Sequence, residues 1–286
     1  WTFLPSVRYD YTQLKPKLTE EFLNTVDPQR QFDHSDKEKT WHRVTPKFGL
    51  TYALTDQYTW FGQYAEGFRP PSAKALFGRF ENLDQGYTVA PNPDLKPESS
   101  KGIETGLRGN FDSGSFDVAV YYNKYRDFID EDAVAAGSTV EQFQAKNIKH
   151  ATIKGIEAKG RMNLDAFGAP QGLYTQGSIA YTYGRNDDNG EPLNSVNPLK
   201  GVFGLGYDQQ NYGALVSWTL VKKQNRVDST TFFSPDGNNG NGPFKTPGFG
   251  IVDLTGFYKV TNDVTITGGL YNLTDKKYWK RDDVGR

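Results

Sequence analysis

The chain has 286 residues with 33 basic and 34 acidic side chains, and this near balance predicts no general attraction to nucleic acid or anionic lipid. It contains no cysteine, which excludes disulfide bonds, thiolate metal sites and a cysteine nucleophile. No apolar stretch approaches the roughly 18 residues of a membrane-spanning helix, so helical spans are excluded, whereas alternating strands remain possible.

Eleven segments are predicted as β-strands, because apolar and polar side chains alternate along them between turn residues. The alternation is clearest in Lys101–Phe111, where Ile103 and Leu107 share one face. In chain order the predicted strands are Thr2–Gln13, Val44–Leu54, Tyr58–Phe68, Lys101–Phe111, Ser115–Asn123, Lys154–Leu164, Gly172–Gly184, Leu199–Tyr207, Tyr212–Val221, Phe249–Lys259 and Val264–Leu273.

The connections between these strands alternate between tight and long. The tight ones are Thr55–Gln57, Asp112–Gly114, Asp165–Gln171, Asp208–Asn211 and Thr261–Asp263. The long ones are Lys15–Arg43, Arg69–Ser99, Asp127–Lys149, Arg185–Pro198 and Lys222–Pro247. Short turns at one rim and long loops at the other are typical of outer-membrane barrels. The pattern predicts an all-β fold, a transmembrane antiparallel β-barrel with short periplasmic turns and long extracellular loops.

Aromatic residues flank the tight turns, as Phe111 and Phe116 do, and Tyr207 and Tyr212. Rings at one height beside the turns indicate an interfacial girdle. A soluble antiparallel sheet with one solvated face would show the same alternation of side chains. The sorting of the loops and the position of the rings favour the membrane barrel.

The number of predicted strands is odd, whereas bacterial single-chain barrels have an even number. An open sheet in lipid would also leave unpaired backbone groups at both edges. We therefore expect residues 1–286 to be part of a larger barrel, with one strand after Arg286 and the others before Trp1. The absence of a leader sequence at Trp1 indicates a mature or shortened fragment.

Little in the sequence indicates catalysis. There are three histidines, and no zinc-protease, nucleophile-elbow or phosphate-loop motif occurs. His34 and His42 fall in the first long connection as weak ligand candidates, with solvated loop histidines as the alternative. His150 begins a strand and is expected to be structural. The chain is therefore not predicted to be an enzyme.

The second long connection is framed by two motifs. It begins with Phe68-Arg69-Pro70-Pro71 and ends with Asn92-Pro93-Asp94-Leu95. These segments resemble the FRAP-like and NPNL-like boxes of haem and haemoglobin receptors in the TonB-dependent outer-membrane transporter family, with one substitution in each. Gly155-Ile156-Glu157 and the segment from Tyr271 to Tyr278 are also similar to segments of that superfamily. The resemblance implies the C-terminal half of a 22-stranded barrel, without the plug domain and the first half.

Many members of this family place a histidine iron ligand between the two boxes, and this sequence has none there. Tyr87 is the candidate in that interval, as an axial haem ligand of the kind implied by the PhuR-like subset of the family. The alternative is that Tyr87 packs within its loop. Arg69 is a weak candidate for pairing with a haem propionate, or it braces the loop against a carboxylate.

The resemblance implies a receptor that captures haem, free or from a haem protein, for TonB-driven import across the outer membrane of a Gram-negative bacterium. Haem is then a transported ligand, its iron contacted through Tyr87, and no catalytic cofactor is expected. Contact with TonB is expected through the absent N-terminal region. One alternative is a siderophore receptor of the same superfamily, and another is a soluble β-rich ligand-binding module.

Overall fold

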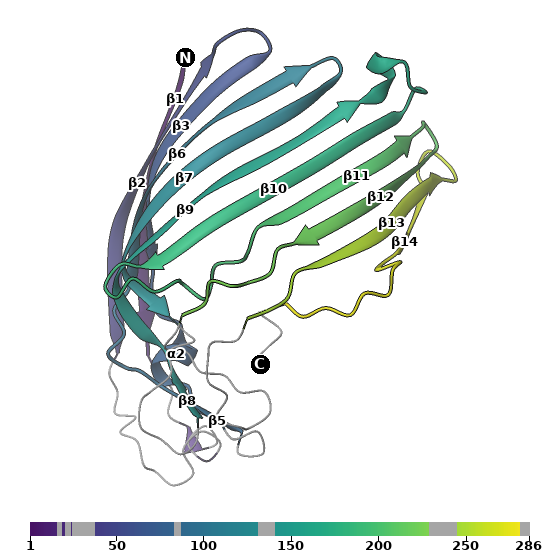
Figure 1. Ribbon diagram of the computed structural model, residues 1–286. Coiled ribbons are helices and arrows are strands. Elements are labelled where there is room, and N and C mark those ends of the chain that lie inside the picture. The colour runs from purple at the N-terminus through teal and green to yellow at the C-terminus, as the bar shows by residue number, and fades with distance from the viewer. Residues whose placement is uncertain are drawn as a thin grey trace.

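The computed structural model describes residues 1–15, 19–20, 24, 38–82, 87–130, 141–228 and 245–280 (Figure 1). Eleven strands form one curved antiparallel sheet, and each predicted strand is confirmed. The strands are β1 (Thr2–Leu14), β2 (Lys39–Ala53), β3 (Tyr58–Arg69), β6 (Glu98–Phe111), β7 (Gly114–Asp130), β9 (Lys146–Asn163), β10 (Leu173–Asn186), β11 (Lys200–Asp208), β12 (Tyr212–Val221), β13 (Phe249–Lys259) and β14 (Thr265–Leu270).

The strands lie in the sheet in the same order as in the chain, and every neighbouring pair is antiparallel. All the short turns therefore lie at one end of the sheet, and the longer connections lie at the other (Figure 1). This confirms the predicted separation of tight turns from long loops.

Four strands extend at least three residues farther toward the long loops than their side-chain pattern predicts. Strand β2 begins at Lys39, β6 at Glu98 and β9 at Lys146, while β7 continues to Asp130. Backbone pairing between β7 and β9 continues through Asp130 and Lys146, although apolar and polar residues no longer alternate there. Main-chain hydrogen bonds do not depend on side-chain type, so the local pattern underestimates these strands.

The structure also contains short elements that the sequence did not predict. Strands β4 (Phe80–Asn82), β5 (Tyr87–Ala90) and β8 (Glu141–Gln144) form a separate small sheet at the long-loop end. Helix α2 (Ala73–Phe77) lies in the second long connection, and the 3₁₀ helix η2 (Leu164–Phe167) in a tight one. These elements are too short to show a periodicity. No helix among the described residues is both long and apolar enough to be a membrane span.

The two faces of the sheet differ in polarity, because residues directly opposite on paired strands share a face. On the apolar face, Ile103 lies opposite Tyr122, and Val120 lies opposite Ile156. All four of these side chains are exposed. On the polar face, Arg108 and Asp117 form an ion pair at 2.9 Å. Beside the short turns Tyr58 contacts Phe111 edge-on, with ring centroids 5.3 Å apart, and the expected cluster of rings is present.

Aromatic rings on the polar face pack against glycines of neighbouring strands. Phe61 contacts Gly106, and Tyr174 contacts Gly206. The two rings are only 7% and 5% exposed, although no second layer covers this face among the described residues. The guanidinium of Arg161 lies 3.5 Å from the centre of the Tyr174 ring, so a basic side chain covers the ring from the open side.

This packing predicts that Gly106→Ala destabilises the sheet. A Cβ atom at residue 106 would lie 2.2 Å from the carbonyl oxygen of Val118 and 2.5 Å from Cζ of Phe61. We expect the free energy of unfolding to fall by roughly 1–3 kcal/mol, measured by denaturant unfolding of the complete protein in detergent. Gly49→Ala on the inner strand β2 is the matched control, because a Cβ there would meet its nearest atom, the Cβ of Leu4, at an ordinary contact distance of 3.5 Å. Equal stability of the two variants would contradict the packing argument.

Candidate functional site

An ion pair closes the base of the second long connection. Arg69 at the end of β3 lies opposite Glu98 at the start of β6, with 2.9 Å between the guanidinium nitrogen and the carboxylate oxygen. Glu98 is 8% exposed, and the same oxygen accepts a hydrogen bond from the backbone N–H of Ile129 at 3.0 Å. Arg69 also donates to the carbonyl oxygen of Ile129 at 3.3 Å. Arg69 therefore braces this loop, and a contact of Arg69 with a haem propionate stays a prediction.

The first box leads directly into helix α2. Pro71 is buried, and the following Ser72 caps the helix by accepting a hydrogen bond from the N–H of Ala75 at 3.1 Å. A serine cap satisfies a helix N–H group that would otherwise lack a partner. The cap orients α2 so that Leu76 has no exposed surface.

Asn92 of the second box connects three segments. Its N–H donates to the carbonyl oxygen of Ala75 at 2.8 Å, which fixes the box to α2. Its side-chain amide donates to the carbonyl oxygen of Ala145 at 2.8 Å, just after β8. Its side-chain oxygen accepts from the N–H of Asp94 at 3.1 Å, which forms a tight turn within the box. Asn92 thus joins the second and third long connections.

A buried apolar cluster lies between these connections. Leu76 of α2 and Leu95 of the second box meet Ile129 of β7 and Ala145, and all four are at most 7% exposed. Partly buried side chains from β1, β2 and α2 pack around the cluster, namely Leu14, Trp41, Ala75 and Phe77. The cluster and the hydrogen bonds of Asn92 place both boxes at one anchoring point.

A second asparagine ties the second and third connections farther along. The side chain of Asn147 accepts a hydrogen bond from the N–H of Lys96 at 2.8 Å and donates to the carbonyl oxygen of Lys96 at 3.0 Å. It also donates to the carbonyl oxygen of Asp127 at 2.8 Å. Asp127 has φ = 51°, a left-handed conformation that aspartate tolerates better than most residues. Glu98 and Asn147 were missed by sequence reasoning, because no motif marks either residue.

Tyr87 is the first residue of β5, in the interval between the two boxes. Its backbone is paired with Asn82 of β4 on one side and with Glu141 of β8 on the other. The structure therefore gives Tyr87 a fixed place in the small sheet at the long-loop end. Its role as an axial haem ligand stays a prediction.

The two histidines that the structure describes, His42 and His150, do not gather at this site. His34 lies outside the described residues. The prediction that His42 lies in a loop is wrong, because β2 begins at Lys39, and His42 is exposed on the apolar face opposite Tyr11. The ring of His150 in β9 hydrogen-bonds the carboxylate of Asp188 at 3.0 Å, and this bond holds the pKa of Asp188 below its usual value.

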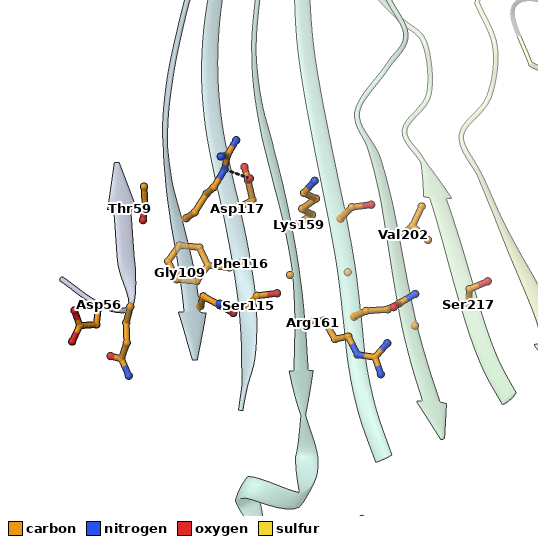
Figure 2. Close-up of a pocket in the computed structure, with 18 residues that line it drawn as sticks. Asp56, Thr59, Gly109, Ser115, Phe116, Asp117, Lys159, Arg161, Val202 and Ser217 are labelled. Carbon is orange, nitrogen blue, oxygen red and sulfur yellow. Dashed lines mark hydrogen bonds and ion pairs between the residues drawn. The ribbon is translucent and has the colours of Figure 1, made fainter. Parts of the chain in front are cut away.

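A hollow lies elsewhere, on the polar face near the short turns (Figure 2). It measures about 760 Å³ and extends across strands β3 to β12, which shows that the polar face is the concave one. Its lining includes the Arg108–Asp117 ion pair together with Lys159 and Arg161, but no histidine. Among the residues that the structure describes, no group of three or more His, Asp or Glu side chains could hold a metal ion.

Two curated relatives cover most of the chain. It is 30% identical over 259 residues to "Probable hemoglobin and hemoglobin-haptoglobin-binding protein 4" of Haemophilus influenzae, spanning 85% of the chain and 26% of that protein. It is 26% identical over 296 residues to "Hemoglobin-haptoglobin utilization protein B" of Neisseria meningitidis serogroup A, spanning 96% of the chain and 36% of that protein. The chain thus spans about a third of the length of these relatives.

Solved structures show the same architecture. The "Copper transporter OprC" matches with a TM-score of 0.75 and 25% identity, over 97% of this chain and 40% of that one. A ferric enterobactin receptor (PfeA) from Pseudomonas aeruginosa matches with a TM-score of 0.60 and 20% identity, over 84% of this chain and 36% of that one. The family description "TonB dependent receptor-like, beta-barrel" fits residues 1–273. The chain therefore belongs to the β-barrel family of TonB-dependent receptors, as the motifs predicted.

Proposed function

We propose that the chain is the C-terminal part of the barrel of an outer-membrane receptor that captures haem, free or from a haem protein. Import would be driven through TonB, which would act on segments N-terminal to this chain. The family consists of transport receptors, and haem in this proposal is a cargo that is neither made nor broken down. The long connections would face the outside of a Gram-negative cell, where the receptor meets its ligand.

One observation carries the proposal. The second of the two boxes that resemble those of haem receptors contributes Leu95 to the buried cluster of Leu76, Leu95, Ile129 and Ala145. The first box is tied to the same cluster, because its Arg69 donates a hydrogen bond to the carbonyl oxygen of Ile129. Asn92 and the Arg69–Glu98 ion pair fix the two ends of the connection between the boxes. A ligand-bearing segment held at both ends loses less conformational freedom on binding, which favours affinity.

Tyr87 would supply the iron contact. A phenolate is a hard anionic oxygen donor, and tyrosine is a known proximal ligand of haem iron. Strand β5 holds the backbone of Tyr87 between two other strands, in contrast to a free loop. A second ligand would come from a plug domain.

The relatives support a haem protein as the source. Both are named for binding or using haemoglobin with haptoglobin, and each covers at least 85% of this chain. The likeness to the enterobactin receptor shows a shared fold and does not identify the ligand of this chain. A siderophore receptor is therefore the second candidate. The affinities of the complete receptor for ferric haem and for ferric enterobactin would distinguish the two functions.

Replacing Tyr87 tests the iron contact. In the complete receptor, Tyr87→Phe should abolish the phenolate-to-iron charge-transfer band in a ferric-haem titration, because phenylalanine has no oxygen donor. Tyr9→Phe is the matched control, since Tyr9 is exposed on the apolar face of β1. A band of unchanged intensity in Tyr87→Phe would remove this residue from the site.

Replacing Asn92 tests the anchoring of the loop. Asn92→Ala removes the bonds to Ala145 and Asp94, a loss of about 1–3 kcal/mol, and we expect haemoglobin to bind about ten-fold more weakly. Limited proteolysis should cleave the second connection faster in this variant. Asn211→Ala, in a short turn where only the backbone carbonyl of Asn211 is bonded, should change neither result. If Asn92→Ala bound haemoglobin as tightly as the wild type, capture would not depend on the hydrogen bonds of Asn92.

A further inference from the structure

The apolar face carries basic residues toward the long-loop end. Lys154 of β9 lies between Tyr122 of β7 and Tyr183 of β10, directly opposite each. One row farther, Lys124 and Arg185 lie on either side of Thr152. Arg126 follows on β7. We call Lys124, Arg126, Lys154 and Arg185 the basic cluster; all four are exposed.

The carboxylates near this cluster are bonded to other groups. Glu66 pairs with Lys101 at 3.0 Å. Asp187 accepts a hydrogen bond from the hydroxyl of Thr152 at 2.6 Å, and Asp188 is bonded to His150. No carboxylate among the described residues lies within 4.0 Å of a cation of the basic cluster. Lys124 lies directly opposite Lys101 of β6, and like charges in opposite positions repel each other, so an anion bound beside Lys124 would stabilise the arrangement.

The lysines of the cluster are held beside aromatic rings. The ammonium of Lys154 lies 5.3 Å from the centre of the Tyr183 ring, and that of Lys124 lies 5.9 Å from the Tyr122 ring. Arg226, from the connection after β12, covers the Tyr183 ring at 3.8 Å. These contacts direct several positive charges to one part of the apolar face.

An apolar hollow begins at the same place. It measures about 740 Å³ and lies on the apolar face, with Lys154 in its lining. The other residues of the hollow that face outward are Ile103, Thr105, Val120, Tyr122, Ile156, Tyr181 and Tyr183. The hollow therefore offers apolar side chains and a cation to one ligand.

The height of the cluster matches a membrane surface. From Phe116, beside a short turn, to Lys124 on the same strand is about 26 Å along the strand and roughly 20 Å along the membrane normal. The apolar band of outer-membrane barrels is about 25 Å tall. With the short turns at one surface, Lys124 and Arg126 lie near the headgroups of the other. Lys154 is level with Tyr122, about 5 Å deeper, and its long side chain can extend toward the headgroups.

We propose that the basic cluster and the apolar hollow bind a phosphorylated lipid of the outer leaflet, with the phosphate on Lys124 and Lys154 and an acyl chain in the hollow. This inference rests on the proposed orientation, in which the long connections face outward. Charge complementarity favours a phosphate, because lysine and arginine are its usual partners. The adjacent apolar surface favours a lipid over a soluble anion, since exposed apolar area is buried when a chain occupies it.

The test uses the complete receptor in detergent and bisphosphorylated lipid A as the probe, with binding measured by native mass spectrometry. Removing two charges with Lys124→Gln/Lys154→Gln should weaken lipid A binding at least about ten-fold. The matched control is Lys159→Gln on β9, which faces the concave side and should bind lipid A as the wild type does. Three comparison ligands separate the contributions to binding. Dephosphorylated lipid A lacks the phosphates, phosphatidylglycerol is an anionic lipid with a different headgroup, and inorganic phosphate lacks the acyl chains.

Wild-type binding that prefers lipid A over all three comparison ligands, and that is lost in the double variant, would support the proposal. Equal binding by the double variant, or equal binding of phosphatidylglycerol, would overturn it. Binding of inorganic phosphate alone with the affinity of lipid A would also overturn it.

Haemoglobin capture is measured separately with the same variants. A wild-type receptor that captures haemoglobin but does not bind lipid A therefore counts against this inference alone. A wild-type receptor that binds lipid A but does not capture haemoglobin counts against the proposed function alone.

Discussion

The continuous ladder of backbone hydrogen bonds from β1 to β14 is the constraint on which the rest of the structure depends. In a bilayer core no water is available to the N–H and C=O groups, so each strand must satisfy them through its neighbours. The ladder fixes the register, and the register decides which side chains face outward. The apolar face, the concave polar face and the height of every charged residue follow from that pairing.

Much of the sheet could be predicted because its information is local. The alternation of apolar and polar residues along Lys101–Phe111 predicts a strand without reference to any other segment. The alternation of short and long connections predicts how the strands are joined. The strand extensions at Lys39 and Asp130 could not be predicted, since their pairing depends on a partner distant in sequence. For the same reason His42 was assigned to a loop, although it lies within β2.

The candidate site was only partly accessible from sequence. The boxes beginning at Phe68 and Asn92 marked the ends of the loop, but not what holds them together. Glu98 stabilises the base because β7 brings the N–H of Ile129 to its carboxylate, a contact between segments about thirty residues apart. Likewise, nothing near Asn147 in the sequence indicates that its side chain bonds Lys96 and Asp127. Such contacts are properties of the folded chain.

The packing of rings on glycines has a consequence for the concave face. Phe61 and Tyr174 lie flat along the wall, because Gly106 and Gly206 leave room beneath them and Arg108 and Arg161 lie above. A ring that projected from the sheet would fill part of the space in front of the concave face. The glycines thus keep that space open, and the guanidinium groups of Arg108 and Arg161 cover the two rings. The concave face therefore presents charge to its surroundings while exposing only 7% and 5% of the two aromatic residues.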